Sequence, residues 1–163
     1  MDTPRSQLIA ALEQTYPRLV RLTATLPDAA LDFQPTADDW SIREILAHSV
    51  DDEMYVMRTR LERIVKEDRP HLAPHDEKQW YATRNTSRDA IDELLADFQL
   101  QRAASLGLIR FLRDSDWARE GFQPEYGHFT AEIWLSHWAT HDVVHLEQIE
   151  RNLAAYQQAQ GAR

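Results

Sequence analysis

The sequence has no cysteine among its 163 residues and only 4 glycines. The lack of cysteine excludes disulfides, thiolate metal ligands and a cysteine nucleophile, and it agrees with a cytoplasmic location. So few glycines argue against an all-β fold, because such a fold needs many tight turns. The sequence also lacks an apolar run near the roughly 18 residues of a membrane span, and its N-terminus lacks the pattern of a signal peptide. We therefore expect a cytoplasmic protein with no membrane partner.

Basic residues are outnumbered, with 18 Lys and Arg against 27 Asp and Glu and a formal net charge of −9. An acidic surface repels a phosphate backbone, so we expect no nucleic-acid partner. Apolar residues make up 43% of the chain, which is typical of a folded protein. A chain of this length is predicted to form one domain over residues 1–163 with a core of its own.

Apolar residues recur at helical spacing in four long segments. The second segment begins with a capping box, in which Ser41 is the N-cap and Glu44 follows three residues later. Pro17 is expected to kink or divide the first segment, and a short helix is expected over residues 78–84. The four long helices are predicted over residues 6–26, 41–66, 88–112 and 130–156. Such helices, joined by one or two longer loops, predict an all-α four-helix bundle.

Three histidines in the last predicted helix, His137, His141 and His145, follow one another at intervals of four residues. On a helix they form one stripe. A helical wheel places this stripe inside an apolar band, with Ile133 and Val144 on one side and Trp134, Trp138 and Ile149 on the other. Buried imidazoles need partners for both ring nitrogens, and a metal ion would satisfy one nitrogen of each ring. Hydrogen-bonded core histidines are the alternative, and a ligand from another helix is needed to decide.

His48, in the segment "EILAHSVDDE" of the second predicted helix, is a candidate for that ligand, although a single histidine is more often structural. Together, "WSIREILAHSVDDE" and "GHFTAEIWLSHWATHDVVHLEQIE" resemble the DinB-like superfamily of four-helix metalloproteins. The resemblance covers residues 40–153 and implies a homodimeric bundle of up-down-down-up topology with long loops. It also implies one divalent metal ion, nickel or zinc foremost and manganese or iron as alternatives. The ligands that it implies are His48, His141 and His145, and His137 lies outside this set.

An ion held by three neutral histidines keeps its positive charge and open coordination positions, which is the pattern of catalytic sites. With the resemblance, this predicts a metal-dependent enzyme for a small-molecule substrate, foremost a low-molecular-weight thiol S-transferase. A metal-dependent hydrolase and a non-catalytic, stress-related metal-binding bundle are the alternatives. A zincin-like peptidase is disfavoured, because "HDVVH" has Asp142 where the zincin motif has Glu.

No catalytic residue is assigned from the sequence. Asp52 and Glu53 are the nearest acidic candidates, but we favour ion pairs with Arg60 or with another helix for both. His75, in the proline-containing segment that follows, is expected to lie in solvent. Arg60 itself is expected on a solvated or ion-paired helix face.

Overall fold

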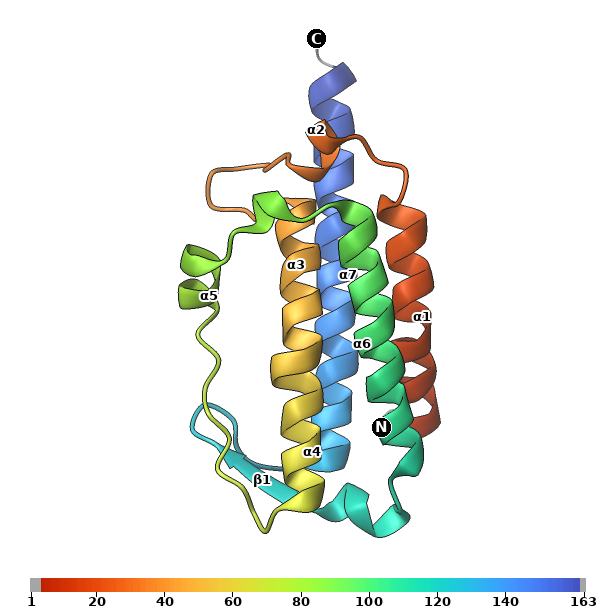
Figure 1. The fold of residues 1–163 in the computed structure, drawn as a ribbon, viewed down its shortest axis with the longest axis vertical. Helices are drawn as coiled ribbons and strands as arrows, with labels where there is room; N and C mark the ends of the chain where they lie inside the picture. The colour runs from red at the N-terminus through yellow and green to blue at the C-terminus, as the bar shows by residue number, and fades with distance from the viewer. Residues whose placement is uncertain (1–3, 162–163) are drawn as a thin grey trace.

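The computed structural model describes residues 4–161, in which long helices form a bundle (Figure 1). Three of the long helices are uninterrupted, namely α1 (Arg5–Thr23), α6 (Ile91–Phe111) and α7 (Ala131–Gly161). The fourth runs without a break through α3 (Ile42–Asp52), the π-helical turn η1 (Glu53–Arg58) and α4 (Thr59–Lys66). The short elements are α2 (Asp28–Leu31), α5 (Glu77–Thr83), η2 (Thr86–Arg88), η3 (Asp114–Ala118) and the strands β1 (Glu120–Gln123) and β2 (Gly127–Thr130).

The direction of the four long helices confirms the predicted up-down-down-up topology. In Figure 1, α1 and α7 run upward, whereas α3–α4 and α6 run downward. Because α3 and α6 are parallel, residues 67–90 must carry the chain back along the bundle between them. This crossover connection passes along the outside of α3 and α4 and carries α5 (Figure 1). Pro17 lies inside α1 and does not divide it.

The start of α3 confirms the capping box predicted from the sequence. The backbone N–H of Glu44 donates to Ser41 Oγ at 3.3 Å, and the backbone N–H of Ser41 donates to Glu44 Oε2 at 2.7 Å. The same end of the helix is joined to α7, because Asn152 Nδ2 donates to the backbone oxygen of Trp40 at 2.7 Å. These contacts fix α3 relative to α7, the two helices that carry the candidate ligands.

A small antiparallel hairpin of β1 and β2 precedes α7, where the sequence predicted only a loop. Gly127 adopts a positive φ of 74°, a conformation that glycine reaches without strain. The hairpin packs closely on the end of α4, since a Cβ at Gly121 would lie 3.0 Å from Ile64 Cγ1. Only four residues form each strand, so their alternating pattern is too short to distinguish from a loop.

The core consists of two apolar clusters, one toward each end of the bundle. Each long helix has a buried polar residue between the parts that belong to the two clusters: Thr15, Glu53, Arg102 and Asp142. We call these four residues the polar layer. None of the helices in the described residues is long and apolar enough to cross a membrane.

Candidate metal centre

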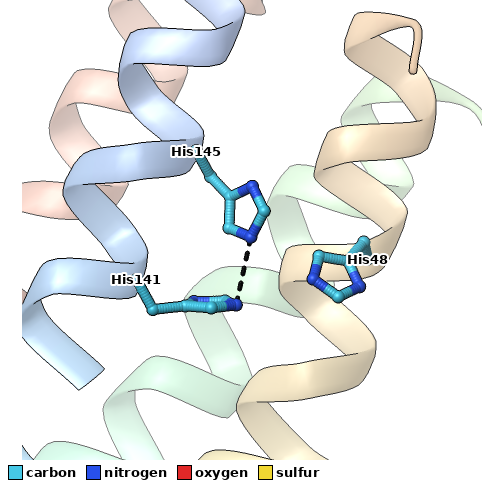
Figure 2. A group of neighbouring side chains, drawn as sticks. All are labelled: His48, His141 and His145. Carbon is cyan, nitrogen blue, oxygen red and sulfur yellow. Dashed lines mark hydrogen bonds between the residues drawn. The ribbon is translucent and has the colours of Figure 1, made fainter. Parts of the chain in front are cut away.

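The structure brings together the three histidines implied as ligands. His48 projects from α3, and His141 and His145 project from α7 toward it (Figure 2). The Nε2 atoms of His141 and His145 lie 3.0 Å apart. One ring nitrogen from each of the three residues lies within 4.8 Å of the other two. This spacing suits a small cation, because an ion about 2 Å from each nitrogen would lie among all three.

Unpartnered nitrogens at this cluster support the same conclusion. The His48 side chain is fully buried at 0% exposure, and neither of its ring nitrogens has a hydrogen-bond partner among the described residues. His141 Nδ1 is also buried without a hydrogen-bond partner in this part of the chain. Buried polar groups are normally hydrogen-bonded, because an unpaired one costs free energy. The donor set therefore fits a divalent metal ion.

His145 is oriented by a hydrogen bond at its other nitrogen. Its Nδ1–H donates to Gln148 Oε1 at 2.7 Å, since an amide oxygen can only accept. Nε2 then keeps its lone pair on the side that faces His141. Burial lowers the pKa of His145 to about 4 and that of His48 to about 3, so both rings are neutral near pH 7, as metal ligation requires.

His141 differs from the other two rings in its charge. Burial acts to lower its pKa, but the neighbouring carboxylates of Asp142 and Asp52 outweigh burial and raise the pKa to about 9. The distances are 4.0 Å from His141 Nδ1 to Asp142 Oδ1 and 3.4 Å from His141 Nε2 to Asp52 Oδ2. In the absence of an ion, His141 is thus protonated, and its Nε2–H can donate to Nε2 of His145. The two nitrogens then do not face each other with two lone pairs.

Asp52 is part of the site, and the ion pair favoured from the sequence, with Arg60 or with another helix, is formed with His141 of α7 rather than with Arg60. It lies one helical turn after His48, and its Oδ2 is 3.5 Å from His48 Nε2. Its Oδ1 is 3.1 Å from Nε2 of His75, which lies in the crossover connection. His48, Asp52 and His75 form a second group whose ligand atoms lie within 4.8 Å of one another. The interval of four residues between His48 and Asp52 is a signal in the sequence for a shared helix face.

His75 is half-buried rather than in solvent, because the crossover connection passes over α3. The same connection supplies Trp80, whose indole donates to Asp51 Oδ2 at 2.8 Å. The rings of Trp80 and Trp40 pack edge-on against His48, at centroid distances of 5.1 and 4.9 Å. The ring of His48 is therefore held in place by aromatic side chains rather than by hydrogen bonds.

The stripe on α7 passes from the surface into the interior. His137 is exposed and stacks on Trp134, with ring centroids 5.0 Å apart, whereas His145 is buried. The predicted apolar band is correct on the Trp134 side and wrong on the other. Ile133 and Val144 are 57% and 44% exposed, because no helix covers that face of α7 within the described residues.

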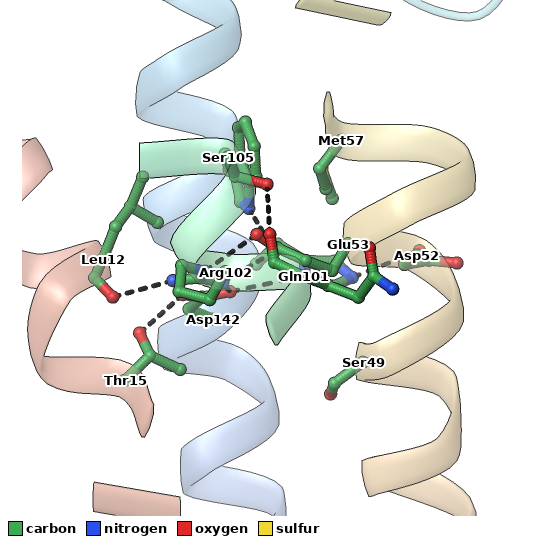
Figure 3. Close-up of polar contacts among 12 residues, drawn as sticks. Leu12, Thr15, Ser49, Asp52, Glu53, Met57, Gln101, Arg102, Ser105 and Asp142 are labelled. Carbon is green, nitrogen blue, oxygen red and sulfur yellow. Dashed lines mark hydrogen bonds and ion pairs between the residues drawn. The ribbon is translucent and has the colours of Figure 1, made fainter. Parts of the chain in front are cut away.

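The polar layer lies beside the site, and its hydrogen bonds are shown in Figure 3. Arg102 uses all of its guanidinium nitrogens: Nε and Nη2 donate to Glu53 at 2.9 and 2.8 Å, and Nη1 and Nη2 donate to Asp142 at 2.6 and 3.0 Å. Nη1 also donates to the backbone oxygen of Leu12 at 2.8 Å. The predicted pairing of Glu53 with another helix is confirmed, but the sequence did not single out Arg102 as the partner.

Two cavities reach the site from different sides. One, of about 470 Å³, is lined by Asp52, His75 and His141, and by Arg60 and Tyr126. We call it the Arg60 cavity. The other, of about 480 Å³, reaches His145 and Gln148 from the side of Trp40. The ligand cluster is thus accessible, although His48 itself is buried.

The chain belongs to the DinB superfamily, whose family model matches residues 11–149. It is similar to "Putative metal-dependent hydrolase YfiT" of Bacillus subtilis (strain 168), at 24% identity over 158 residues, covering 91% of this chain and 85% of the relative. It is also similar to "Putative metal-dependent hydrolase OB0782" of Oceanobacillus iheyensis, at 27% identity over 137 residues, covering 83% and 78%.

A solved structure of YfiT from Bacillus subtilis, described as a probable metal-dependent hydrolase with an unusual four-helix bundle topology, has the same fold. It superposes with a TM-score of 0.83 at 23% identity and covers 93% of this chain and 91% of its own. The resemblance seen in the two histidine segments and the predicted four-helix bundle are both confirmed.

Proposed function

We propose that this protein is a metal-dependent hydrolase whose divalent ion is held by His48, His141 and His145. The observation that carries the proposal is the fully buried ring of His48, which has no hydrogen-bond partner within residues 4–161 and faces the Nε2 atoms of His141 and His145. The names of the two relatives support hydrolysis as the reaction class. Imidazole ligands suit zinc and nickel, and the family resemblance favours these two metals over manganese and iron.

A divalent ion with open positions, when bound, supplies Lewis acidity and a water whose pKa is about 7. The protein orients the ligands and supplies a carboxylate that can accept a proton. Gln148 fixes the tautomer of His145, and the two tryptophan rings exclude water from His48. Asp52 lines the Arg60 cavity, and its buried Oδ1 lies 3.1 Å from His75 Nε2, so a proton accepted by the carboxylate has an imidazole beside it.

Transfer of a low-molecular-weight thiol is the second candidate. It is supported by the family resemblance and by the absence of cysteine, since a thiol would then have to enter as a substrate. A cytoplasmic homodimer is proposed on the resemblance and the composition.

The proposal is tested with protein loaded separately with zinc, nickel, manganese or iron. Each form is assayed with a panel of esters and amides, and then with an electrophile and a panel of thiols. We expect hydrolysis that stops on chelation and in His48→Ala, and that persists in Arg63→Gln, a variant at an exposed ion pair with Glu67. Hydrolysis by His48→Ala without bound metal would overturn the proposal. Turnover only with thiols would favour the transferase, and bound metal without turnover would favour a non-catalytic bundle.

A further inference from the structure

Arg60, in α4, is a buried arginine that forms no ion pair with the described part of the chain. Its side chain lines the Arg60 cavity, and the residue is only 7% exposed. Among residues 4–161, two other arginines are buried to this degree, Arg43 and Arg102. Each of those forms ion pairs with two carboxylates, at 2.6–2.9 Å. In the same residues no carboxylate pairs with Arg60, although a buried charge normally requires a partner.

The guanidinium of Arg60 is held in a fixed plane. Its Nη2 donates to the backbone oxygen of Ala73 in the crossover connection at 2.7 Å. Its Cζ lies 5.2 Å from the ring centroid of Trp134, which is itself fixed by a 2.9 Å hydrogen bond from its indole to the backbone oxygen of Met57. Nε and Nη1 form no hydrogen bond within the described residues. Because neither is among the fully buried unpaired atoms, both remain accessible at the cavity wall.

The charges around the cavity determine which ligand suits this arginine. Asp76, Glu77 and Glu125 line the cavity but are exposed, so solvent and salt screen them. Asp52 is the buried acidic residue that lines the cavity. Its single negative charge would be outweighed by the two positive charges of a divalent ion at the three histidines. The buried lining then attracts an anion. A carboxylate, which is planar and carries a single negative charge, suits the one planar guanidinium that lines the cavity.

We propose that Arg60 binds a carboxylate group of the substrate. This inference rests on the proposed function, because it treats the Arg60 cavity as the place where the substrate lies. Arg60 is eight residues after Asp52, and because the π turn η1 takes up one of them, the helix rises about 10 Å between the two residues. The side chain of Arg60 leans back toward the start of the helix. The substrate carboxylate therefore lies several bonds from the group that reacts at the metal, and Arg60 selects the substrate without touching the reacting atoms.

The test compares the binding of hexanoate, neutral hexanamide and inorganic phosphate to the zinc-loaded protein by isothermal titration calorimetry. We expect Arg60→Gln to weaken hexanoate binding at least tenfold and to leave hexanamide binding unchanged. Arg63→Gln, one turn further along the same helix and outside the cavity, should bind both as the wild type does. Arg60→Lys keeps the charge and should restore part of the affinity. A second measurement is the ¹⁵N signal of Arg60 Nε, which should shift on titration with hexanoate.

Two results would overturn the subsite: hexanoate binding within twofold of wild type in Arg60→Gln, or equal losses for hexanoate and hexanamide. Binding of phosphate through Arg60 more tightly than hexanoate would overturn the choice of a carboxylate. If Arg60→Gln or Arg60→Lys loses its helical circular dichroism, the ¹⁵N signal of the wild type decides. The two proposals fail differently. Turnover without any dependence of binding on Arg60 removes the subsite, whereas Arg60-dependent binding without turnover removes the hydrolase.

Discussion

Two buried polar clusters lie side by side at the middle of the bundle, and they differ in how well their hydrogen-bonding groups are satisfied. In the polar layer, every guanidinium nitrogen of Arg102 donates to a protein oxygen. In the histidine cluster, both nitrogens of His48 and one of His141 lack such partners among the described residues. His48 is as deeply buried as Arg102, at 0% and 2% exposure, so the difference between these two residues lies in pairing. A fully paired cluster stabilises the fold, whereas an incompletely paired one indicates a ligand that completes it.

The largest effect is expected in the polar layer. Arg102→Met leaves the carboxylates of Glu53 and Asp142 buried without their cation, and removing one member of a buried ion-pair network costs about 3–5 kcal/mol. Urea denaturation of the metal-free protein measures this loss. The control is His48→Leu in the same protein, which replaces unpaired nitrogens by apolar atoms and should change the free energy of unfolding by less than about 1 kcal/mol. Equal losses for the two variants would remove the distinction between the clusters.

The next effect concerns the metal itself. His48→Ala, His141→Ala and His145→Ala should each lose most of the bound metal, because each removes one of three ligands. His137→Ala should keep it, since His137 stacks on Trp134 outside the cluster. Elemental analysis after dialysis against a metal buffer gives the occupancy. Metal loss in His137→Ala with retention in His145→Ala would mean that the ligand pair on α7 lies one turn earlier.

A smaller effect is expected from the hydrogen bond that orients His145. Gln148→Leu removes the acceptor of His145 Nδ1 and leaves all three proposed ligands in place. Loss of such a partner typically weakens metal affinity 10–100-fold. Competition with a chromophoric chelator measures the affinity. Gln148→Glu keeps an acceptor and serves as the matched variant, and it should bind metal more tightly than Gln148→Leu. Equal affinity in Gln148→Leu and the wild type would show that the tautomer is fixed by other contacts.

The smallest effect is expected on the overall fold when the metal is removed. The two apolar clusters and the polar layer do not depend on the ion, so chelation should leave the helical circular dichroism at room temperature largely unchanged. The melting temperature should fall by several degrees, since a ligand at one hundred times its dissociation constant adds about 2.7 kcal/mol. Loss of most of the helical signal on chelation would show that the histidine cluster is as essential to the fold as the polar layer.

The sequence predicted the parts of this protein that local patterns encode. The capping box at Ser41, the long helices and the interval between His141 and His145 all depend on residues within one or two turns. The topology and the choice of His48 came from the family resemblance, because the sequence alone does not show which helices pack together. His75 and Arg102 were not identified for the same reason: each meets its partner across a long loop or another helix. The roles of His75 and Arg102 depend on tertiary contacts, which helical periodicity does not predict.

The π turn η1 determines the side of the helix on which Arg60 lies, where it is buried at a cavity instead of on the solvated or ion-paired face that was expected. In a regular α-helix, twelve residues from His48 to Arg60 advance the side-chain direction by about 120° beyond whole turns. A turn closed by bonds between residues i and i+5 takes up one extra residue, which reduces this angle to about 20°. Arg60 therefore lies on nearly the same side of the helix as His48. The extra residue in η1 does not change which side chains of α3 and α4 share a face. A homologue one residue shorter in this turn would therefore present the same faces.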